Sequence, residues 1–114
     1  MATLKLNAWG QDHKITLSTD RYDNNGNLAV QMWCLDDEEF PEPWSMLTVN
    51  LIKKCKPNCA FIDTNNNGDS IIDWLVKNNL GCETGNFEIS GFCIYPEFEF
   101  NIDELKKYEE VEIC

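Results

Sequence analysis

The sequence predicts an α+β fold: a mainly antiparallel sheet of five or six strands, one main helix packed on one face of it, and a short C-terminal helix as a further element. Two observations indicate this class. Segments in which apolar and polar residues alternate are separated by turns rich in Gly and Asn, which is typical of antiparallel strands. Residues 70–79 instead place apolar residues at helical spacing, and such a face must be buried against a sheet. Residues 1–114 have the length of one domain and are expected to fold as a single domain.

The first two strands are expected at residues 3–8 and 12–22, with a stop at Gly10 between them. In the second strand Thr16 and Ser18 belong to the polar half of the alternation. We therefore expect that face of the strand to contact solvent.

A third strand is expected at residues 27–35, after a turn with the sequence DNNGN. In that turn Gly26 is suited to a positive φ angle. The strand itself is apolar on both faces, so we place it in the centre of the sheet.

Residues 36–44 predict a loop, because four consecutive acidic residues repel one another and two prolines lack the N–H that a strand ladder needs. A fourth strand is expected at residues 44–52, where Leu47, Val49 and Leu51 share one face.

The main helix is predicted from about Ser70 to Asn79, after a short apolar strand at residues 59–62. Ser70 is the expected N-cap, and Gly81 suits the left-handed position at the C-terminal end. The broad apolar face of this helix predicts that it lies on the sheet.

Residues 84–100 predict two short strands that are broken at Gly91. Pro96 indicates that the second is an edge or bulged strand. Four apolar side chains of this second part are expected to point inward: Phe92, Ile94, Phe98 and Phe100.

A short C-terminal helix is expected after these strands. Asn101 or Asp103 is suited to start it, and Leu105, Tyr108 and Val111 would form its apolar side.

The chain has no apolar stretch near the ~20 residues that a membrane helix needs, and its first ten residues lack the regions of a signal peptide. We therefore expect a cytoplasmic protein without membrane contact. Six cysteines are present, and in that compartment reduced thiols are favoured over disulfides, which remain the alternative.

The formal net charge is -11, and most of it lies in two blocks. The first contains five acidic residues between positions 36 and 42, and the second contains seven acidic residues from Glu97 onward against two lysines. Direct binding to nucleic acid or to an anionic membrane is disfavoured, because phosphate contacts need clustered Lys and Arg. A protein partner, if there is one, is expected to be basic or neutral; the alternative is that both blocks are solvated surface that maintains solubility.

Four blocks occur in a specific order and spacing: NNGNLAVQ, LTVNL, NCAFIDTNNN and SGFCIYPEFEF. In combination they resemble the domain-of-unknown-function 4313 family, small proteins of Gram-positive bacteria and their mobile genetic elements. The resemblance covers roughly residues 3 to 105. It implies a bacterial cytoplasm and a gene on a plasmid, phage or integrated conjugative element, and it brings no established activity or site residues.

Two metal motifs are incomplete. The loop from Asp63 has Asn and Gly at calcium-loop positions, but Trp74 stands where a bidentate carboxylate is needed, so an Asx-rich turn that caps the following helix is favoured. Cys55 and Cys59 have a spacing found in zinc sites, with Cys82 and Cys93 further on, but no second close pair exists. We therefore assign no metal-binding residue, no cofactor and no divalent ion needed for folding.

A cysteine nucleophile would need the single histidine, His13, beside Cys93 or Cys59. His13 lies near the end of a predicted hairpin, which is more often a surface position, so a small enzyme with a cysteine nucleophile is only the third hypothesis. No catalytic or cofactor-binding residue is assigned.

The favoured hypothesis is a non-catalytic protein-protein interaction module that carries aromatic residues beside acidic ones. An acidic mimic of nucleic acid that inhibits a restriction or CRISPR nuclease is the alternative, and it requires carboxylates at phosphate-like intervals. The candidate interaction surface consists of Asp36, Asp37, Glu38, Glu39, Phe40 and Trp44.

Overall fold

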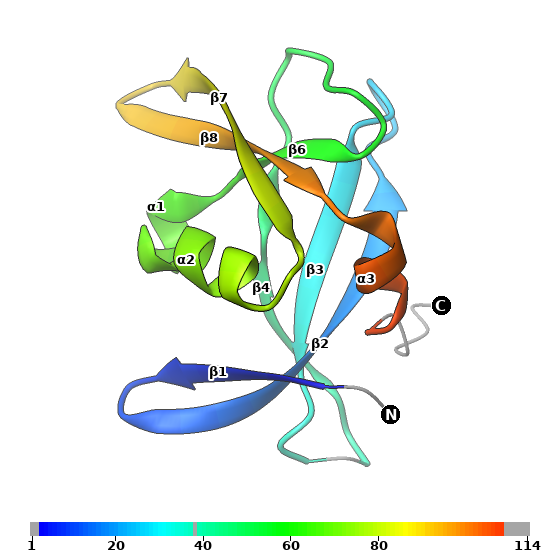
Figure 1. The fold of residues 1–114 in the computed structure, drawn as a ribbon, viewed down its shortest axis with the longest axis vertical. Helices are drawn as coiled ribbons and strands as arrows, with labels where there is room; N and C mark the ends of the chain where they lie inside the picture. Colours follow the sequence, from blue (N-terminus) through cyan, green and yellow to red (C-terminus); the bar gives the residue numbers. More distant parts are fainter. Residues whose placement is uncertain (1–2, 38, 109–114) are drawn as a thin grey trace.

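The structure is a computed structural model that describes residues 3–37 and 39–108. Its elements are, in chain order, β1 (Leu4–Ala8), β2 (Gln11–Arg21), β3 (Leu28–Cys34), β4 (Glu42–Met46), β5 (Thr48–Val49), β6 (Cys59–Ile62), α1 (Thr64–Asn67), α2 (Ser70–Lys77), β7 (Gly81–Ser90), β8 (Cys93–Phe100) and α3 (Ile102–Lys106). The strands form two four-stranded antiparallel sheets, in the orders β1-β2-β3-β4 and β5-β6-β8-β7 (Figure 1). The protein is therefore mostly β.

The expected single sheet with one main helix is wrong, and the error lies in the fourth strand. Residues 44–52 divide at a bend at Leu47: β4 ends in the first sheet and β5 begins in the second. The backbone N–H of Leu47 donates to the carbonyl of Val30 in β3, and its carbonyl accepts from Asp63 after β6, both at 2.9 Å. The alternation of apolar and polar residues changes phase here, because Met46 and Leu47 are consecutive apolar residues, but such a change does not by itself show that the chain passes to another sheet.

The three helices are short. The helix predicted from Ser70 begins there, but it ends at Lys77 rather than at Asn79 and has only eight residues. The left-handed residue after it is Asn79, with φ of 60°, and not Gly81 as expected. The N-cap is Asp69, without a side-chain capping bond, so the prediction of Ser70 as N-cap is also wrong. None of the helices in the described part of the chain has the length and apolar content to cross a bilayer.

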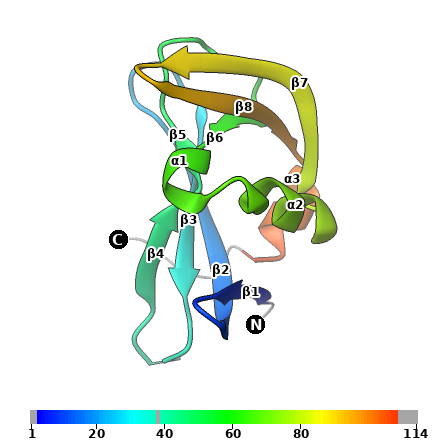
Figure 2. The same cartoon turned by 90° about the vertical axis from the view of Figure 1, so that its left-hand side faces the viewer.

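One main core lies between the two sheets and beneath α2 and α3. Figures 1 and 2 show the sheets and these two helices from directions at right angles. Strands of both sheets and both of these helices contribute buried apolar side chains. The fully buried members include Ile15, Leu17, Val30, Met32, Leu47, Ile62, Leu75, Phe98 and Leu105. A second cluster of Cys55, Cys59 and Phe61 lies apart from the main core.

The middle of the polar face of β2 is buried, contrary to the prediction that this face contacts solvent, whereas Lys14 on the same face is exposed. Thr16 is fully buried and Ser18 is 6% exposed. The carbonyl of Tyr108 accepts from the Thr16 hydroxyl and, at 3.1 Å, from the Leu17 N–H, while Ser18 Oγ accepts from Trp33 Nε1 at 2.8 Å. The backbone at Tyr108, after α3, thus bonds to the edge of β2 beyond the part that pairs with β1. A local sequence pattern cannot predict this contact between distant segments.

The short C-terminal helix is present as α3. Asn101 is its N-cap, and its side chain accepts from the Glu104 N–H at 3.3 Å. Leu105 is buried as expected, whereas Val111 lies outside the described residues.

The two strands predicted on either side of Gly91 are present as β7 and β8, which pair as a hairpin, and Gly91 has φ of 61°. Phe98 and Phe100 are buried as expected, but Phe92 is fully exposed and Ile94 is 59% exposed. The difference arises because β6 pairs with β8 only from Glu97 to Glu99, so the end of the hairpin extends beyond the body. From Glu97 to Glu99 β8 is paired on both sides, so the expectation of an edge strand is wrong for that part, whereas Pro96 pairs with β7 alone.

Candidate functional site

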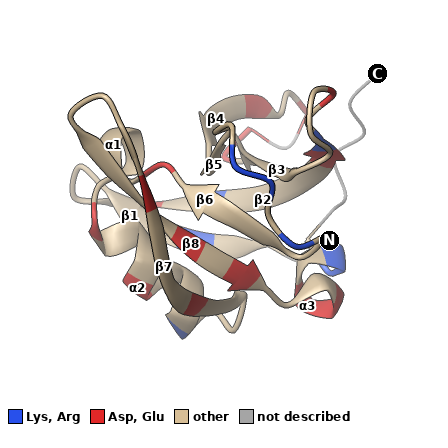
Figure 3. Cartoon of the chain, turned by 90° about the horizontal axis from the view of Figure 1, so that it is seen from above, with Lys and Arg blue, Asp and Glu red and all other residues tan. Residues whose placement is uncertain are grey.

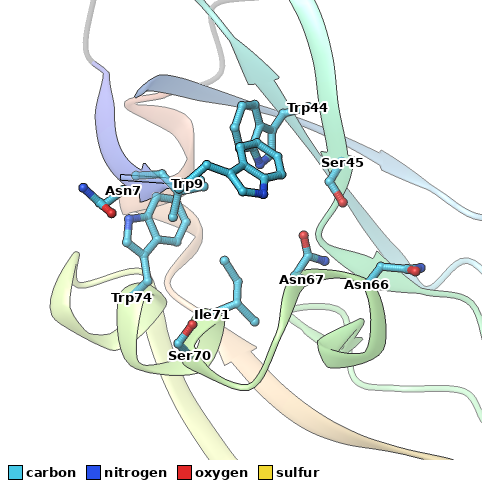
Figure 4. Close-up of a pocket in the computed structure, with 11 residues that line it drawn as sticks. Asn7, Trp9, Trp44, Ser45, Asn66, Asn67, Ser70, Ile71 and Trp74 are labelled. Carbon is cyan, nitrogen blue, oxygen red and sulfur yellow. The ribbon is translucent and has the colours of Figure 1, made fainter. Parts of the chain in front are cut away.

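A groove of about 500 Å³ lies between the β1–β2 turn, β4, α1 and α2 (Figure 4). We call it the tryptophan groove. Its walls carry three indole rings and several neutral polar side chains: Trp9, Trp44, Trp74, Asn7, Ser45, Asn66, Asn67 and Ser70. Among the residues that the structure describes, none that lines this groove is charged.

Trp9 occupies an unusual backbone position. It forms with Gly10 the two-residue turn of the β1–β2 hairpin, and the two residues have φ of 50° and 76°. Turns with positive φ at both positions strongly prefer Asn-Gly, because a larger side chain in the left-handed region costs about 1–2 kcal/mol. The Trp9 side chain is nevertheless 87% exposed, so little burial offsets that cost.

Trp44 connects the groove to the interior. Its ring centroid lies 5.6 Å from that of Trp9 and 4.8 Å from that of His13. It is half-buried and packs against the main core. Figure 4 shows the Trp9 and Trp44 rings side by side above the opening.

Hydrogen bonds fix the remaining walls. Trp74 Nε1 donates to the carbonyl of Lys5 at 2.8 Å, which joins α2 to β1. Asn67 Nδ2 donates to the carbonyl of Met46 at 3.0 Å, which joins α1 to β4. A groove held in this way binds a ligand with a smaller loss of conformational entropy.

The acidic loop, residues 36–41, begins beside the groove and is anchored by Asp36. The Asp36 carboxylate accepts from the Lys14 backbone N–H at 2.9 Å and lies 2.7 Å from His13 Nδ1. These two contacts, with the backbone one first, lower the pKa of Asp36. The His13 ring also contacts the Trp44 ring, so His13 lies between Asp36 and Trp44.

The other predicted site residues lie further along this loop. Asp37 accepts from the backbone N–H groups of Glu39 and Phe40, each at 3.1 Å. Glu39 is exposed and Phe40 is 66% exposed, whereas Glu38 lies outside the described residues. Of the predicted residues, only Trp44 lines the groove, and Phe40 stands apart from it.

A family model described as a domain of unknown function, DUF4313, matches residues 16–113. The chain belongs to this family. The matched range begins within β2, so Trp9 and His13 precede it. No curated protein and no solved structure matches the chain.

In this DUF4313 protein His13 does not meet Cys93 or Cys59, as the cysteine-nucleophile hypothesis required. It lies instead with Cys34 and Asp36, and one ligand atom from each lies within 4.8 Å of the other two. Burial is the main cause that raises the pKa of Cys34, and the Asp36 charge adds to it. The register of β2 and β3 follows from the turn between them. Aligning these two strands from the sequence would therefore have identified this cluster.

The other metal motifs of this DUF4313 protein have structural roles. The Asp63 carboxylate accepts from the Asn66 N–H at 3.1 Å and from Asn66 Nδ2 at 2.7 Å, so it caps α1, a short helix inside the predicted turn. The helix that the turn was expected to cap, α2, has no side-chain capping bond, so that part of the prediction is wrong. Cys55 and Cys59 pack with Phe61. Burial, followed by a hydrogen bond with Glu97, raises the pKa of Cys55 to about 12.

Proposed function

We propose that this protein is a non-catalytic protein-interaction module whose docking surface is the tryptophan groove with the adjoining acidic loop. The observation that carries the proposal is Trp9: a large apolar side chain that is 87% exposed on a turn where it strains the backbone. Residues held in sparsely populated backbone conformations cluster at functional sites. Folding alone favours Asn at this position, so binding gives a reason for Trp.

The chemistry of the surface supports a basic or neutral protein partner. Trp and Tyr are enriched among the residues that dominate binding energy, and Trp9 with Trp44 offers adjacent ring faces. Asp37 and Glu39 of the acidic loop and Glu42 at the start of β4 are exposed and would steer a basic partner. That the gene belongs to a bacterial mobile element remains an expectation from the family resemblance.

The enzyme hypothesis is weaker. Among the described residues, the cysteine that lies together with His13 is Cys34, and its raised pKa leaves little thiolate at neutral pH, although the thiolate is the nucleophile.

The nucleic-acid mimic is also weaker. Acidic residues are spread over β7, β8, α2 and α3 (Figure 3). Two carboxylates of the acidic blocks are engaged by other side chains of the protein: the exposed Asp36 by His13, and the buried Glu97 by Thr84 at 2.8 Å. A mimic needs its carboxylates presented outward.

The test uses Trp9→Asn, a change that improves the turn while it removes the ring. The wild type and the variant are immobilised, exposed to lysate of the source organism, and the retained proteins are identified by mass spectrometry. We expect a basic protein on the wild type and its loss from Trp9→Asn, with folding stability equal or higher. Ile52→Ala is the control, because Ile52 is 99% exposed and lies outside the groove. Identical retention by the wild type and Trp9→Asn would refute the proposal.

Once a partner is in hand, the two kinds of contact separate kinetically. Neutralising Asp37, Glu39 and Glu42 should slow association and reduce its dependence on salt. Phe40→Ala should speed dissociation, since truncating an aromatic anchor costs about 2 kcal/mol or more. Unchanged rates in both variants would assign the acidic loop to solvated surface.

A further inference from the structure

We infer that His13, Cys34 and Asp36 form a binding site for a zinc ion at the end of the first sheet. One ligand atom from each residue lies within 4.8 Å of the other two, and His13 Nδ1 is 2.7 Å from Asp36 Oδ2. Ligands around a tetrahedral zinc ion are separated by about 3–4 Å, given Zn–N and Zn–S bonds of about 2.0 and 2.3 Å. The observed separations bracket that range, so small side-chain rotations suffice.

The fold brings the three ligands together without strain. In the β2–β3 register Cys34 is opposite Ile15. His13 precedes Ile15 by two positions, and Asp36 follows Cys34 by two, so all three side chains lie on one face at one end of this strand pair. The backbone bond from the Leu35 N–H to the Lys14 carbonyl, at 2.8 Å, holds this end closed.

The donor set suits zinc. Imidazole nitrogen, thiolate sulfur and carboxylate oxygen are its three protein donor types, and thiolate with carboxylate balances its charge. Three protein ligands leave the fourth position to a water molecule. When Zn²⁺ binds, a Zn–S bond forms as the thiol proton of Cys34 passes to solvent, and His13 takes its Nε2–H tautomer so that the proton Nδ1 shares with Asp36 no longer occupies the ligand position.

Contacts that orient the ligands already exist. The Lys14 N–H donates to Asp36 Oδ1, which leaves Oδ2 toward His13. The His13 ring packs against Trp44 and lies edge-on to Trp9, at centroid distances of 4.8 and 6.5 Å. Outer contacts such as the one from Lys14 typically change metal affinity by about 10–100-fold. His13 Nε2 is buried and has no hydrogen-bond partner among the described residues, so it adds no such contact.

The zinc site shares Asp36 with the acidic loop, but its test is a metal titration that needs no docking partner, and the inference does not make the ion necessary for folding. The test uses the full chain, reduced and stripped of metal with a chelator. Zn²⁺ binding is measured by calorimetry, and Co²⁺ serves as a spectroscopic probe because thiolate ligation gives it a charge-transfer absorption. We expect one ion per chain and a thiolate-to-cobalt band.

Cys34→Ser and Asp36→Asn should each weaken Zn²⁺ binding at least about tenfold, and Cys34→Ser should abolish the cobalt band. Asp36→Asn keeps an oxygen that can accept from the Lys14 N–H, so this variant should stay folded. It therefore tests the site even if Cys34→Ser proves unstable by circular dichroism. Cys93→Ser is the control, since Cys93 is also half-buried but lies at the tip of the β7–β8 hairpin. The inference is overturned if the wild type binds no Zn²⁺, or if Asp36→Asn and every folded Cys34→Ser sample bind it as tightly as the wild type.

Discussion

Glu97 is a buried carboxylate whose protonation state is tied to the fold. It is 8% exposed, and a bulge in β7 brings Thr84 and Asn86 to its Oε1 at 2.8 and 3.2 Å. Burial raises the pKa of Glu97, but hydrogen bonds from Thr84, Asn86 and Cys55 outweigh it, so the pKa is lowered overall. The charged form is therefore the one that the folded protein binds best.

This sets the direction of a pH effect. A carboxyl whose pKa is lowered by folding adds stability above its unfolded pKa of about 4.3, and loses it as the pH falls through the lower folded value. We expect Glu97→Gln to be less stable at pH 7 by about 1 kcal/mol, and to lose less stability than the wild type on acidification. Urea unfolding at a series of pH values measures both effects.

Glu99→Gln is the matched control, because Glu99 is an exposed neighbour on the same strand. Its pH profile should follow that of the wild type. A Glu97→Gln profile parallel to the wild type would show that the bulge does not favour the charged carboxylate.

At the scale of single elements, Gly81 determines whether β7 can start beside β8. It has φ of 148°, and a Cβ there would lie 2.0 Å from the carbonyl oxygen of Glu99. Gly81→Ala should therefore lower the free energy of unfolding by at least about 2 kcal/mol. Gly91→Ala should cost only about 1 kcal/mol, because its φ is 61° but no atom lies within 4 Å of the added Cβ. Equal losses in denaturant titrations would remove the steric explanation.

Leu47 lies at the bend that connects β4 of the first sheet to β5 of the second. It is fully buried, and its backbone bonds to Val30 and Asp63 remain in a Leu47→Ala variant. The loss of the side chain should still cost about 2–5 kcal/mol, because the cavity opens between the sheets. Ile52→Ala, at an exposed position, should change the free energy of unfolding by less than about 0.5 kcal/mol. A Leu47→Ala protein as stable as this control would contradict the assignment of Leu47 to the core.

The sequence correctly predicts elements whose signals lie within a few neighbouring residues. It fails where the structure depends on contacts between distant residues. Strands β1 and β2 follow from alternation, β3 and β6 from apolar runs, and the strands on either side of Gly91 from the break there. The turn at Gly26 has the positive φ that was predicted, 72°. The bend at Leu47 and the burial of Thr16 depend on contacts distant in sequence. The same holds for the site: Trp44 was predicted, but its contacts with Trp9 and His13 require the strand register.

The whole molecule carries a net charge of -11, which few ion pairs in its described part offset. Self-repulsion should therefore lower its stability at low ionic strength. Raising NaCl from about 0.01 to about 1 M shortens the Debye length from about 30 to about 3 Å, so we expect a higher melting temperature at pH 7. Near the sequence pI of about 4.3 this gain should disappear. A melting temperature that falls with salt at pH 7 would mean that ion pairs outweigh repulsion.

The bonds that join β2 to Tyr108 have a consequence for synthesis on the ribosome. Thr16 and Tyr108 are 92 positions apart, and the residues that cover the inner face of the first sheet include Phe98 and Leu105. Chains emerge from the N-terminus at about 5–20 residues per second, so β1–β4 precede Tyr108 by roughly 3–12 s. During that interval the nascent first sheet exposes Ile15, Leu17 and Met32, and it is the species that a ribosome-associated chaperone would have to protect.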